Sequence, residues 1–166
     1  PPELSRLNPL RRLPVWVTDE NKPVFGSNTI IDFLEVVEPD GLLPEEPLHR
    51  ARCWMADEMA RDGLLEPLIA IDRSMTGREP GDWDLVVYRK KVRKVQRTLD
   101  VFEALLGGRD WLVGDDISVA DLSVALPLTI LERYGIDLDA RPGLKALRER
   151  LNSRYAVVEA RKRPAA

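Results

Sequence analysis

Prolines and a polar turn divide the start of this chain into short extended segments. Pro14 has no backbone N–H and a fixed φ, so it suits the first position of a strand or a cis peptide bond, and not a strand interior. Val15-Trp16-Val17 is therefore expected to form a short strand, residues 18–23 a polar turn, and Val24-Phe25 the beginning of a return strand. The pattern predicts a β-hairpin, that is, two short antiparallel strands joined by the polar turn.

A helix is predicted directly after the hairpin, with Ser27 at its N-cap. The apolar residues behind Ser27 recur at spacings of one, three and three, as a helix requires: Ile30, Ile31, Leu34 and Val37. A serine hydroxyl beside the N–H groups of a helix N-terminus is a geometry that binds a carboxylate. The other interpretation is an ordinary capping serine that has no ligand.

Residues 39–44 contain two prolines and a glycine and predict a linker between the hairpin segment and the rest of the chain. Strand signals are absent after it. A long helix is expected from about Glu46 to Ile71, and Gly63 and Pro67 are expected to kink or divide it. Five of its residues fall on one stripe at alternating spacings of four and three: Leu48, Arg52, Met55, Met59 and Asp62.

A second helix is expected from about Trp83 to Leu106, ended by Gly107-Gly108. Its apolar stripe alternates spacings of four and three: Tyr88, Val92, Val95, Leu99, Phe102 and Leu106. Further on, Ser118 and Asp121 have the spacing of a capping box. The helix that they open, Val119 to about Tyr134, is apolar nearly all round, which predicts burial at the centre of a bundle.

Composition restricts the class of protein. The chain has 166 residues, of which 44% are hydrophobic, so it can bury a core. A net charge of -3 gives no general attraction for nucleic acid or anionic membrane, and no apolar run reaches the roughly 18–20 residues of a membrane span. The single cysteine, Cys53, excludes an internal disulfide and suits a reducing cytoplasm. With His49 as the only histidine, neither a histidine metal site nor a Ser-His-Asp triad is supported.

Two motifs resemble the glutathione S-transferase family. The hairpin resembles the second half of its thioredoxin-like domain in Asn8-Pro9, Leu13-Pro14 and Ser27, and departs at Gly26, where the family usually carries Glu or Gln. The capping box within residues 114–121 resembles the signature of the family's all-helical second domain. The resemblance continues through Arg141–Leu151 and Tyr155–Val158, and so spans nearly the whole chain. It implies an α+β fold: a partial thioredoxin-like, glutathione-binding domain (1–38) followed by an all-α bundle (45–166).

The resemblance also implies an activity. In such enzymes the glutathione thiol is conjugated to small hydrophobic electrophiles, with glutathione as co-substrate and no metal. Ser27 would bind the γ-glutamyl carboxylate, and the backbone of Leu13, before a cis Pro14, would pair with the cysteinyl backbone. Gly26 offers only its backbone to the glutamyl ammonium. The family lines its electrophile pocket in a region that corresponds to Met55, Met59, Arg61 and Asp62.

The same resemblance implies a homodimeric detoxification enzyme. The composition adds the expectation of a cytoplasmic protein that binds neither nucleic acid nor membrane. No catalytic residue is identified within the sequence. The residue that activates the thiol is expected upstream of Pro1, in a β-α-β unit that would pair with the hairpin.

Two other functions remain open. Gly26 favours a non-catalytic member of the same fold that serves as an interaction or regulatory module. A run of basic residues without an intervening acid suggests nucleic-acid binding, but no aromatic residues are interleaved for base stacking, and a solvated helix face is favoured. The run comprises Arg89, Lys90, Lys91, Arg93, Lys94 and Arg97.

Overall fold

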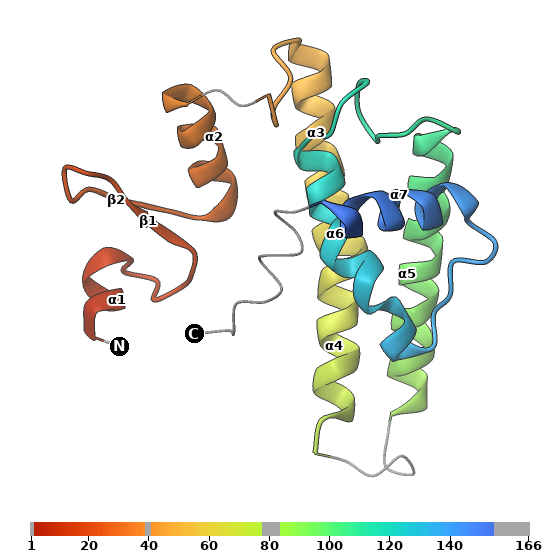
Figure 1. Ribbon diagram of the computed structural model, residues 1–166. Coiled ribbons are helices and arrows are strands. Elements are labelled where there is room, and N and C mark those ends of the chain that lie inside the picture. The colour runs from red at the N-terminus through yellow and green to blue at the C-terminus, as the bar shows by residue number, and fades with distance from the viewer. Residues whose placement is uncertain (1, 39–40, 78–83, 155–166) are drawn as a thin grey trace. The chain divides into compact units, whose positions relative to one another are not determined.

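The computed structural model describes residues 2–38, 41–77 and 84–154. The chain divides into two compact units, residues 1–43 and 44–166. In the described residues the first unit contains a two-stranded sheet with helices, and the second contains helices alone (Figure 1). This confirms the predicted fold class. The division falls between the predicted domains 1–38 and 45–166, and the glutathione-binding role of the first remains a prediction.

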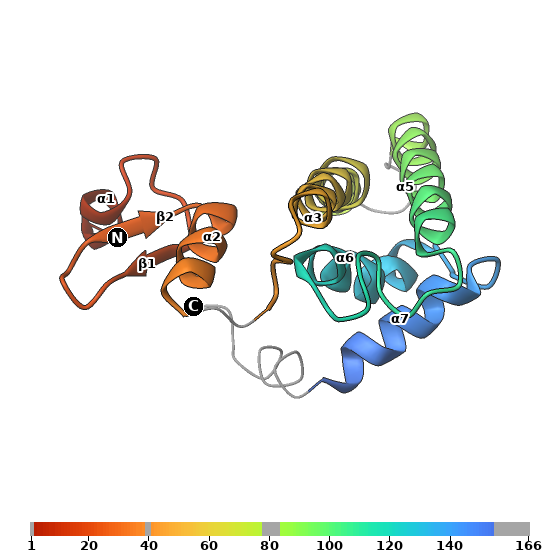
Figure 2. The ribbon, with the colours of Figure 1, turned by 90° about the horizontal axis from the view of Figure 1, so that it is seen from above.

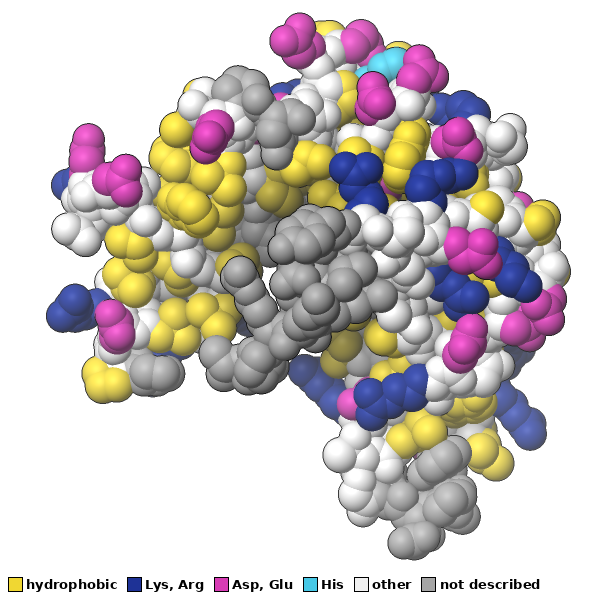
Figure 3. Space-filling model, in the orientation of Figure 1, with side chains coloured by type: hydrophobic (Ala, Val, Ile, Leu, Met, Phe, Trp, Pro, Cys, Tyr) yellow, Lys and Arg dark blue, Asp and Glu magenta, His cyan; other side chains and the backbone are white. Residues whose placement is uncertain are grey.

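The N-terminal unit is a hairpin with a helix packed on it. Strand β1 (Val15–Val17) pairs antiparallel with β2 (Pro23–Phe25), and helix α2 (Ser27–Val37) contacts both strands (Figure 1). The predicted hairpin is confirmed. A short helix, α1 (Pro2–Leu7), precedes it and had no sequence prediction. Large apolar side chains remain exposed on this unit (Figure 3): Leu10, Leu13, Trp16, Val17, Phe25, Val36 and Val37.

The long helix predicted from Glu46 is divided, as Gly63 and Pro67 indicated. Helix α3 (Pro47–Ala60) passes into a π-helical turn (Arg61–Leu65, the π segment) and then into α4 (Glu66–Met75). The Glu66 N–H donates to the Arg61 carbonyl, five residues back. A proline ring in a helix clashes with the carbonyl four residues before it, and the wider π turn accommodates Pro67 without ending the helical column.

The buried stripe of this column differs from the stripe noted in the sequence. Small side chains on α3 face the core, and larger ones follow along the π segment and α4: Cys53, Ala56, Ala60, Leu64, Leu68 and Ile71. Leu48 and Met55, from the sequence stripe, are exposed instead. Small residues let neighbouring helices approach closely, so the packing surface of α3 is apolar without being bulky.

The remaining helices complete the bundle of the second unit. They are α5 (Leu85–Leu106), α6 (Val119–Ile130), a 3-10 turn η3 (Leu131–Tyr134) and α7 (Pro142–Ser153). Helix α3 packs on α6, and α7 packs on both α5 and α6 (Figure 2), while α4 packs on α5 (Figure 1). In α5, Val95, Leu99, Phe102 and Leu106 are buried, and Gly107 ends the helix in a left-handed conformation, as predicted. Trp83 and residues 155–158 lie outside the described residues.

Helix α6 is only partly buried. Ala120, Val124 and Leu128 are fully buried, but Leu122 and Leu126 are exposed, so the prediction of a helix buried all round was wrong for one face. Apolar composition alone does not determine which face of a helix is covered by neighbouring helices.

The capping box at the start of α6 is confirmed. The Asp121 carboxylate accepts the Ser118 N–H (2.9 Å) and the Ser118 hydroxyl (3.1 Å), and it also accepts the Leu112 N–H (2.8 Å). Burial raises the pKa of the Asp121 carboxyl, while these hydrogen bonds act in the opposite direction. The third hydrogen bond, which the capping-box motif does not include, fixes the loop before α6.

Among the described helices, none combines the length and the apolarity needed to cross a bilayer.

Candidate functional site

Asn8 fixes the loop that leads into Pro14. Its side chain is almost completely buried: Nδ2 donates to the Arg12 carbonyl (2.7 Å), and Oδ1 accepts the Leu10 N–H (2.9 Å). The Leu13–Pro14 peptide bond that follows is cis, as the resemblance implied. Leu13 is 74% exposed. The sequence motif contained Asn8 without assigning it a role, and the structure shows that both ends of its amide hold this loop.

The start of α2 differs from the prediction by one residue. Gly26, and not Ser27, is the N-cap, with φ 90° and ψ 127°, and its carbonyl accepts the Ile30 N–H (2.9 Å). Ser27 is the first helical residue. The placement of Ser27 at the N-cap was therefore wrong, because the turn from β2 into α2 requires a positive φ that glycine adopts without strain.

A backbone hydrogen bond joins the residue after Leu13 to the residue before Ser27. The Gly26 N–H donates to the Pro14 carbonyl (3.3 Å), and the next pair along, Val15 and Phe25, are partners in the sheet. Leu13 and Ser27 are the next residues outward on either side of this hydrogen bond. The structure thus places the predicted glutathione-binding residues Leu13, Pro14, Gly26 and Ser27 at one end of the hairpin.

The N-terminus of α2 is electrostatically suited to an anion. No side chain caps it, and its first turn contains no acidic residue. The first N–H groups of a helix have no partner within the helix and carry a partial positive charge. A carboxylate at this position would accept these N–H groups, with the Ser27 hydroxyl as an additional donor.

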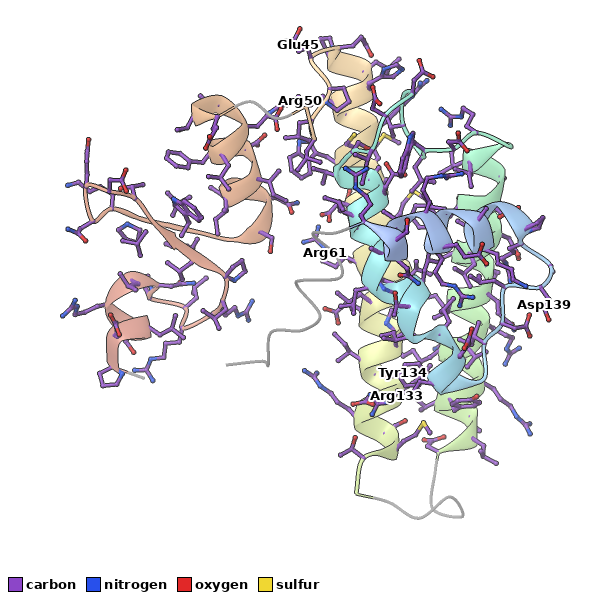
Figure 4. All side chains as sticks on the ribbon, in the orientation of Figure 1. Glu45, Arg50, Arg61, Arg133, Tyr134 and Asp139 are labelled. Atoms are coloured by element: carbon purple, nitrogen blue, oxygen red, sulfur yellow. The ribbon has the colours of Figure 1, made fainter. Side chains whose placement is uncertain are left out.

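The four candidate pocket residues on α3 and the π segment do not share one face. Met55 and Met59 line an apolar groove of about 490 Å³ against Phe102 and Leu105 of α5. Met59 and Asp62 line an adjoining groove of about 680 Å³ against α5. Arg61 lines neither groove and instead pairs with Asp57 on the side of the column away from α5 (Figure 4). These two grooves therefore do not bring all four residues together.

The basic run lies on the exposed surface of α5. Lys90, Lys91, Lys94 and Arg97 form one wall of the 680 Å³ groove, opposite Glu58 and Asp62. Arg93 and Arg97 donate to backbone carbonyls one helical turn earlier. The favoured interpretation, a solvated helix face, agrees with this exposure. The structure adds that part of this face forms one wall of a groove.

Cys53 is fully buried. His49 is paired locally, its Nδ1 lying 3.8 Å from Glu46 Oε2. Within residues 2–38, 41–77 and 84–154, no cluster of His, Cys, Asp and Glu has the arrangement of a metal site.

Comparison with known proteins identifies the family. Residues 1–37 match the sequence profile of the glutathione S-transferase N-terminal domain, and residues 75–154 match that of the C-terminal domain. The maleylacetoacetate isomerase of Pseudomonas aeruginosa is 32% identical over 146 residues, covering 87% of this chain and 68% of that protein. The chain belongs to the glutathione S-transferase family.

The chain is also similar to proteins that carry other names. The disulfide-bond oxidoreductase YfcG of Escherichia coli is 29% identical over 168 residues, covering 96% of this chain and 75% of that protein. A glutathione S-transferase of Methylobacterium radiotolerans, solved in complex with glutathione sulfonate, superimposes with a TM-score of 0.79 at 26% identity. That alignment covers 94% of this chain and 74% of the solved one.

Proposed function

We propose that this member of the glutathione S-transferase family is an enzyme that joins the glutathione thiol to small hydrophobic electrophiles. The observation that carries the proposal is the Gly26–Pro14 hydrogen bond, which joins the residue before Ser27 to the residue after the exposed Leu13. A peptide thiol with a carboxylate at one end fits this arrangement. Its carboxylate would bind at Ser27 and its backbone would pair with Leu13 in the manner of an added strand.

The chemistry follows from a bound thiolate. The sulfur attacks an electron-poor carbon, a C–S bond forms, and either a leaving group departs or a proton is taken up by the adjacent carbon. Ser27 and Leu13 bind and orient glutathione in this scheme. Thiol activation is not assigned to any residue of the described ranges. A detoxifying role in the cytoplasm accords with the single, buried cysteine.

The isomerase among the relatives supports a second candidate reaction. Addition of a thiolate to a conjugated cis-alkene, rotation about the new single bond and expulsion of the thiolate give the trans-alkene and regenerate glutathione. The first step is the same as in conjugation. The 32% identity with the Pseudomonas aeruginosa maleylacetoacetate isomerase favours this candidate over other thiol chemistry.

One experiment separates these reactions. Full-length protein is incubated with glutathione and either 1-chloro-2,4-dinitrobenzene or maleylacetoacetate, and thiol consumption and product are measured together. Conjugation consumes one thiol for each product formed, whereas isomerisation produces the trans-alkene with no loss of thiol. If neither substrate reacts above the rate without enzyme, the interaction module, which Gly26 favours, replaces both proposals.

We also propose that the protein is a homodimer whose copies meet at the α3–α5 face. An acidic wall (Glu58, Asp62) and a basic wall (Lys90, Lys94, Arg97) flank the same groove, so a two-fold axis would set each wall against its opposite in the second copy. Light scattering should give twice the chain mass. Lys94→Glu with Arg97→Glu should shift the protein toward monomer, and adding Glu58→Lys with Asp62→Lys should restore the dimer.

A further inference from the structure

The 490 Å³ groove lies within the second unit, between α3 and α5. Its floor is covered by the packing of the bundle: Phe102 is fully buried, and Leu112 and Val113 are each 5% exposed. Its rim is apolar but open, since Met55 is 58% and Leu105 is 47% exposed. A hollow of this size can enclose a small molecule, and large apolar side chains that are exposed together often mark a binding site.

The charged residues of this groove are of one sign. Among the described residues that line it, Arg52 and Arg109 are the charged ones, and none is Asp or Glu. Within the described part of the chain, Arg52 makes no hydrogen bond or ion pair. The two backbone hydrogen bonds of the α3 cap lower the pKa of Glu46 most, and the charge of Arg52 adds a smaller effect. An apolar groove with positive charge and no negative charge in its lining is suited to an anion.

Arg109 is held in place at the C-terminal end of α5. Its Nε donates to the Leu106 carbonyl (3.3 Å). Its Nη2 donates to the carbonyls of Leu105 (2.7 Å) and Leu112 (3.1 Å). These hydrogen bonds satisfy carbonyls at the end of the helix and fix the guanidinium. In the part of the chain that the structure describes, Nη1 donates to no acceptor, so a positioned donor remains for a ligand.

The two arginines lie at the same end of the groove. Helices α3 and α5 run in opposite directions (Figure 1), and Arg109 follows the last turn of α5 while Arg52 belongs to the first half of α3. At the other end, Met59 and Val101 line both this groove and the 680 Å³ groove. From Arg52 to Met59, α3 rises by about 10 Å. The groove therefore has a positive end and an apolar body.

We propose that this groove binds an amphipathic anion, a molecule with a carboxylate at one end of an apolar body. The carboxylate would accept N–H groups of Arg52 and Arg109, and the body would lie along Met55 and Phe102 toward Met59. This site goes beyond the proposed thiol transfer, since it belongs wholly to the second unit and needs no contact with glutathione. The homodimer contact proposed above uses the charged walls of the adjoining groove, at the opposite end from the two arginines.

The test uses two probes that share one apolar chain and differ in the head group. Full-length protein is titrated calorimetrically with octanoate and with octan-1-ol. Octanoate should bind at one site for each chain and at least about tenfold more tightly than octan-1-ol, because a hydrogen bond to a charged group changes affinity by about ten- to a hundredfold. Acetate, which has the head without the body, should show no binding at millimolar concentration.

Variants assign the head and the body of the ligand. Arg52→Gln should weaken octanoate binding by about tenfold or more and change octan-1-ol binding by less than about twofold. Arg52→Lys should retain part of the affinity for octanoate, since it keeps the charge but loses the planar pairing. Met55→Gln places a polar group against the apolar body and should weaken both probes alike. Arg73→Gln, an exposed arginine of α4 that lines neither groove, is the matched control and should change neither.

The outcomes separate this site from the thiol chemistry. Glutathione affinity should be the same with and without saturating octanoate. Equal affinities for octanoate and octan-1-ol, unchanged octanoate binding in Arg52→Gln, or absence of octanoate binding at millimolar concentration would each overturn the proposal. Octanoate that competes with 1-chloro-2,4-dinitrobenzene in the thiol-transfer assay would place the ligand in the reaction site and overturn a separate site. Thiol transfer itself stands under each of these results.

Discussion

Gly63 of the π segment faces Thr98 of α5 so closely that a β-carbon built at Gly63 would lie 2.5 Å from Thr98 Cγ2. Gly63 is buried, and the packing of the π segment on α5 depends on the missing side chain.

Gly63→Ala should therefore destabilise the protein by about 1–3 kcal/mol, the usual cost of overpacking a core. The direction of this change in stability is informative, because a glycine-to-alanine substitution within a helix otherwise stabilises a protein by about 0.5–1 kcal/mol. Denaturant unfolding measures the change. Thr98→Ala removes Oγ1 and Cγ2, so it should recover part of the loss in the double variant. An unfolding free energy of Gly63→Ala above that of wild type would show that the two helices are not in close contact.

In the capping network, Asp121 should contribute more to the stability of the protein than Ser118. Asp121→Ala leaves the N–H groups of Leu112 and Ser118 buried without an acceptor, and should cost about 2–6 kcal/mol at roughly 1–3 kcal/mol for each group. Ser118→Ala removes a cap hydroxyl and should cost about 0.5–2 kcal/mol. Unfolding midpoints of the two variants, compared in the same denaturant, test this order. Equal losses would mean that the link from Asp121 to Leu112 contributes nothing.

The features that were predicted correctly from the sequence depend on residues close together in the chain. Pro14 and the polar turn define the hairpin, Gly107 ends α5, and the spacing of Ser118 and Asp121 defines the capping box, because each depends on residues that are neighbours in the chain. Ser27 was misplaced by one position, since serine and glycine both suit an N-cap and only the positive φ of Gly26 decides between them.

Contacts between distant residues could not be read from the sequence in this way. The Asp57–Ser123 hydrogen bond joins residues 66 apart in the chain, and it follows from the crossing of α3 and α6. The π turn likewise depends on packing between distant segments, because α3 packs on α6 and α4 packs on α5. For this reason the sequence grouped Arg61 with Met55 and Met59, although they lie on different sides of the helical column.

Glu46 should make the start of α3 sensitive to acid. Its carboxylate accepts the N–H groups of Leu48 (2.9 Å) and His49 (2.6 Å), and these hydrogen bonds lower the pKa of Glu46. A carboxyl whose pKa is lower in the folded state contributes stability above its unfolded pKa, and this is lost as pH falls through the folded value. Wild type should therefore lose stability from about pH 5 downward more steeply than Glu46→Gln. Thermal melts across this range test the difference, and parallel pH profiles would refute the cap.

Gly26 should limit the affinity for glutathione. A β-carbon there would have room, since its nearest neighbour would be Thr29 Oγ1 at 3.6 Å, but the φ of 90° is costly for any residue with a side chain. Gly26→Gln, which restores a residue usual in the family, should tighten glutathione binding and lower stability by about 1–3 kcal/mol. Calorimetric titration and thermal unfolding of the same variant measure both effects. Weaker binding in a folded variant would place the glutamyl ammonium elsewhere.

The most direct test of the account is calorimetric titration of full-length protein with glutathione, repeated for Ser27→Ala and for the exposed control Ser5→Ala. No side chain caps α2, so Ser27→Ala should leave stability nearly unchanged while weakening glutathione binding by about 1.5–3 kcal/mol, the range for a hydrogen bond to a charged group. Ser5→Ala should bind as wild type does. Absence of binding to wild type at millimolar glutathione, or equal affinity of wild type and Ser27→Ala, would contradict the assignment of this helix N-terminus as the glutathione site.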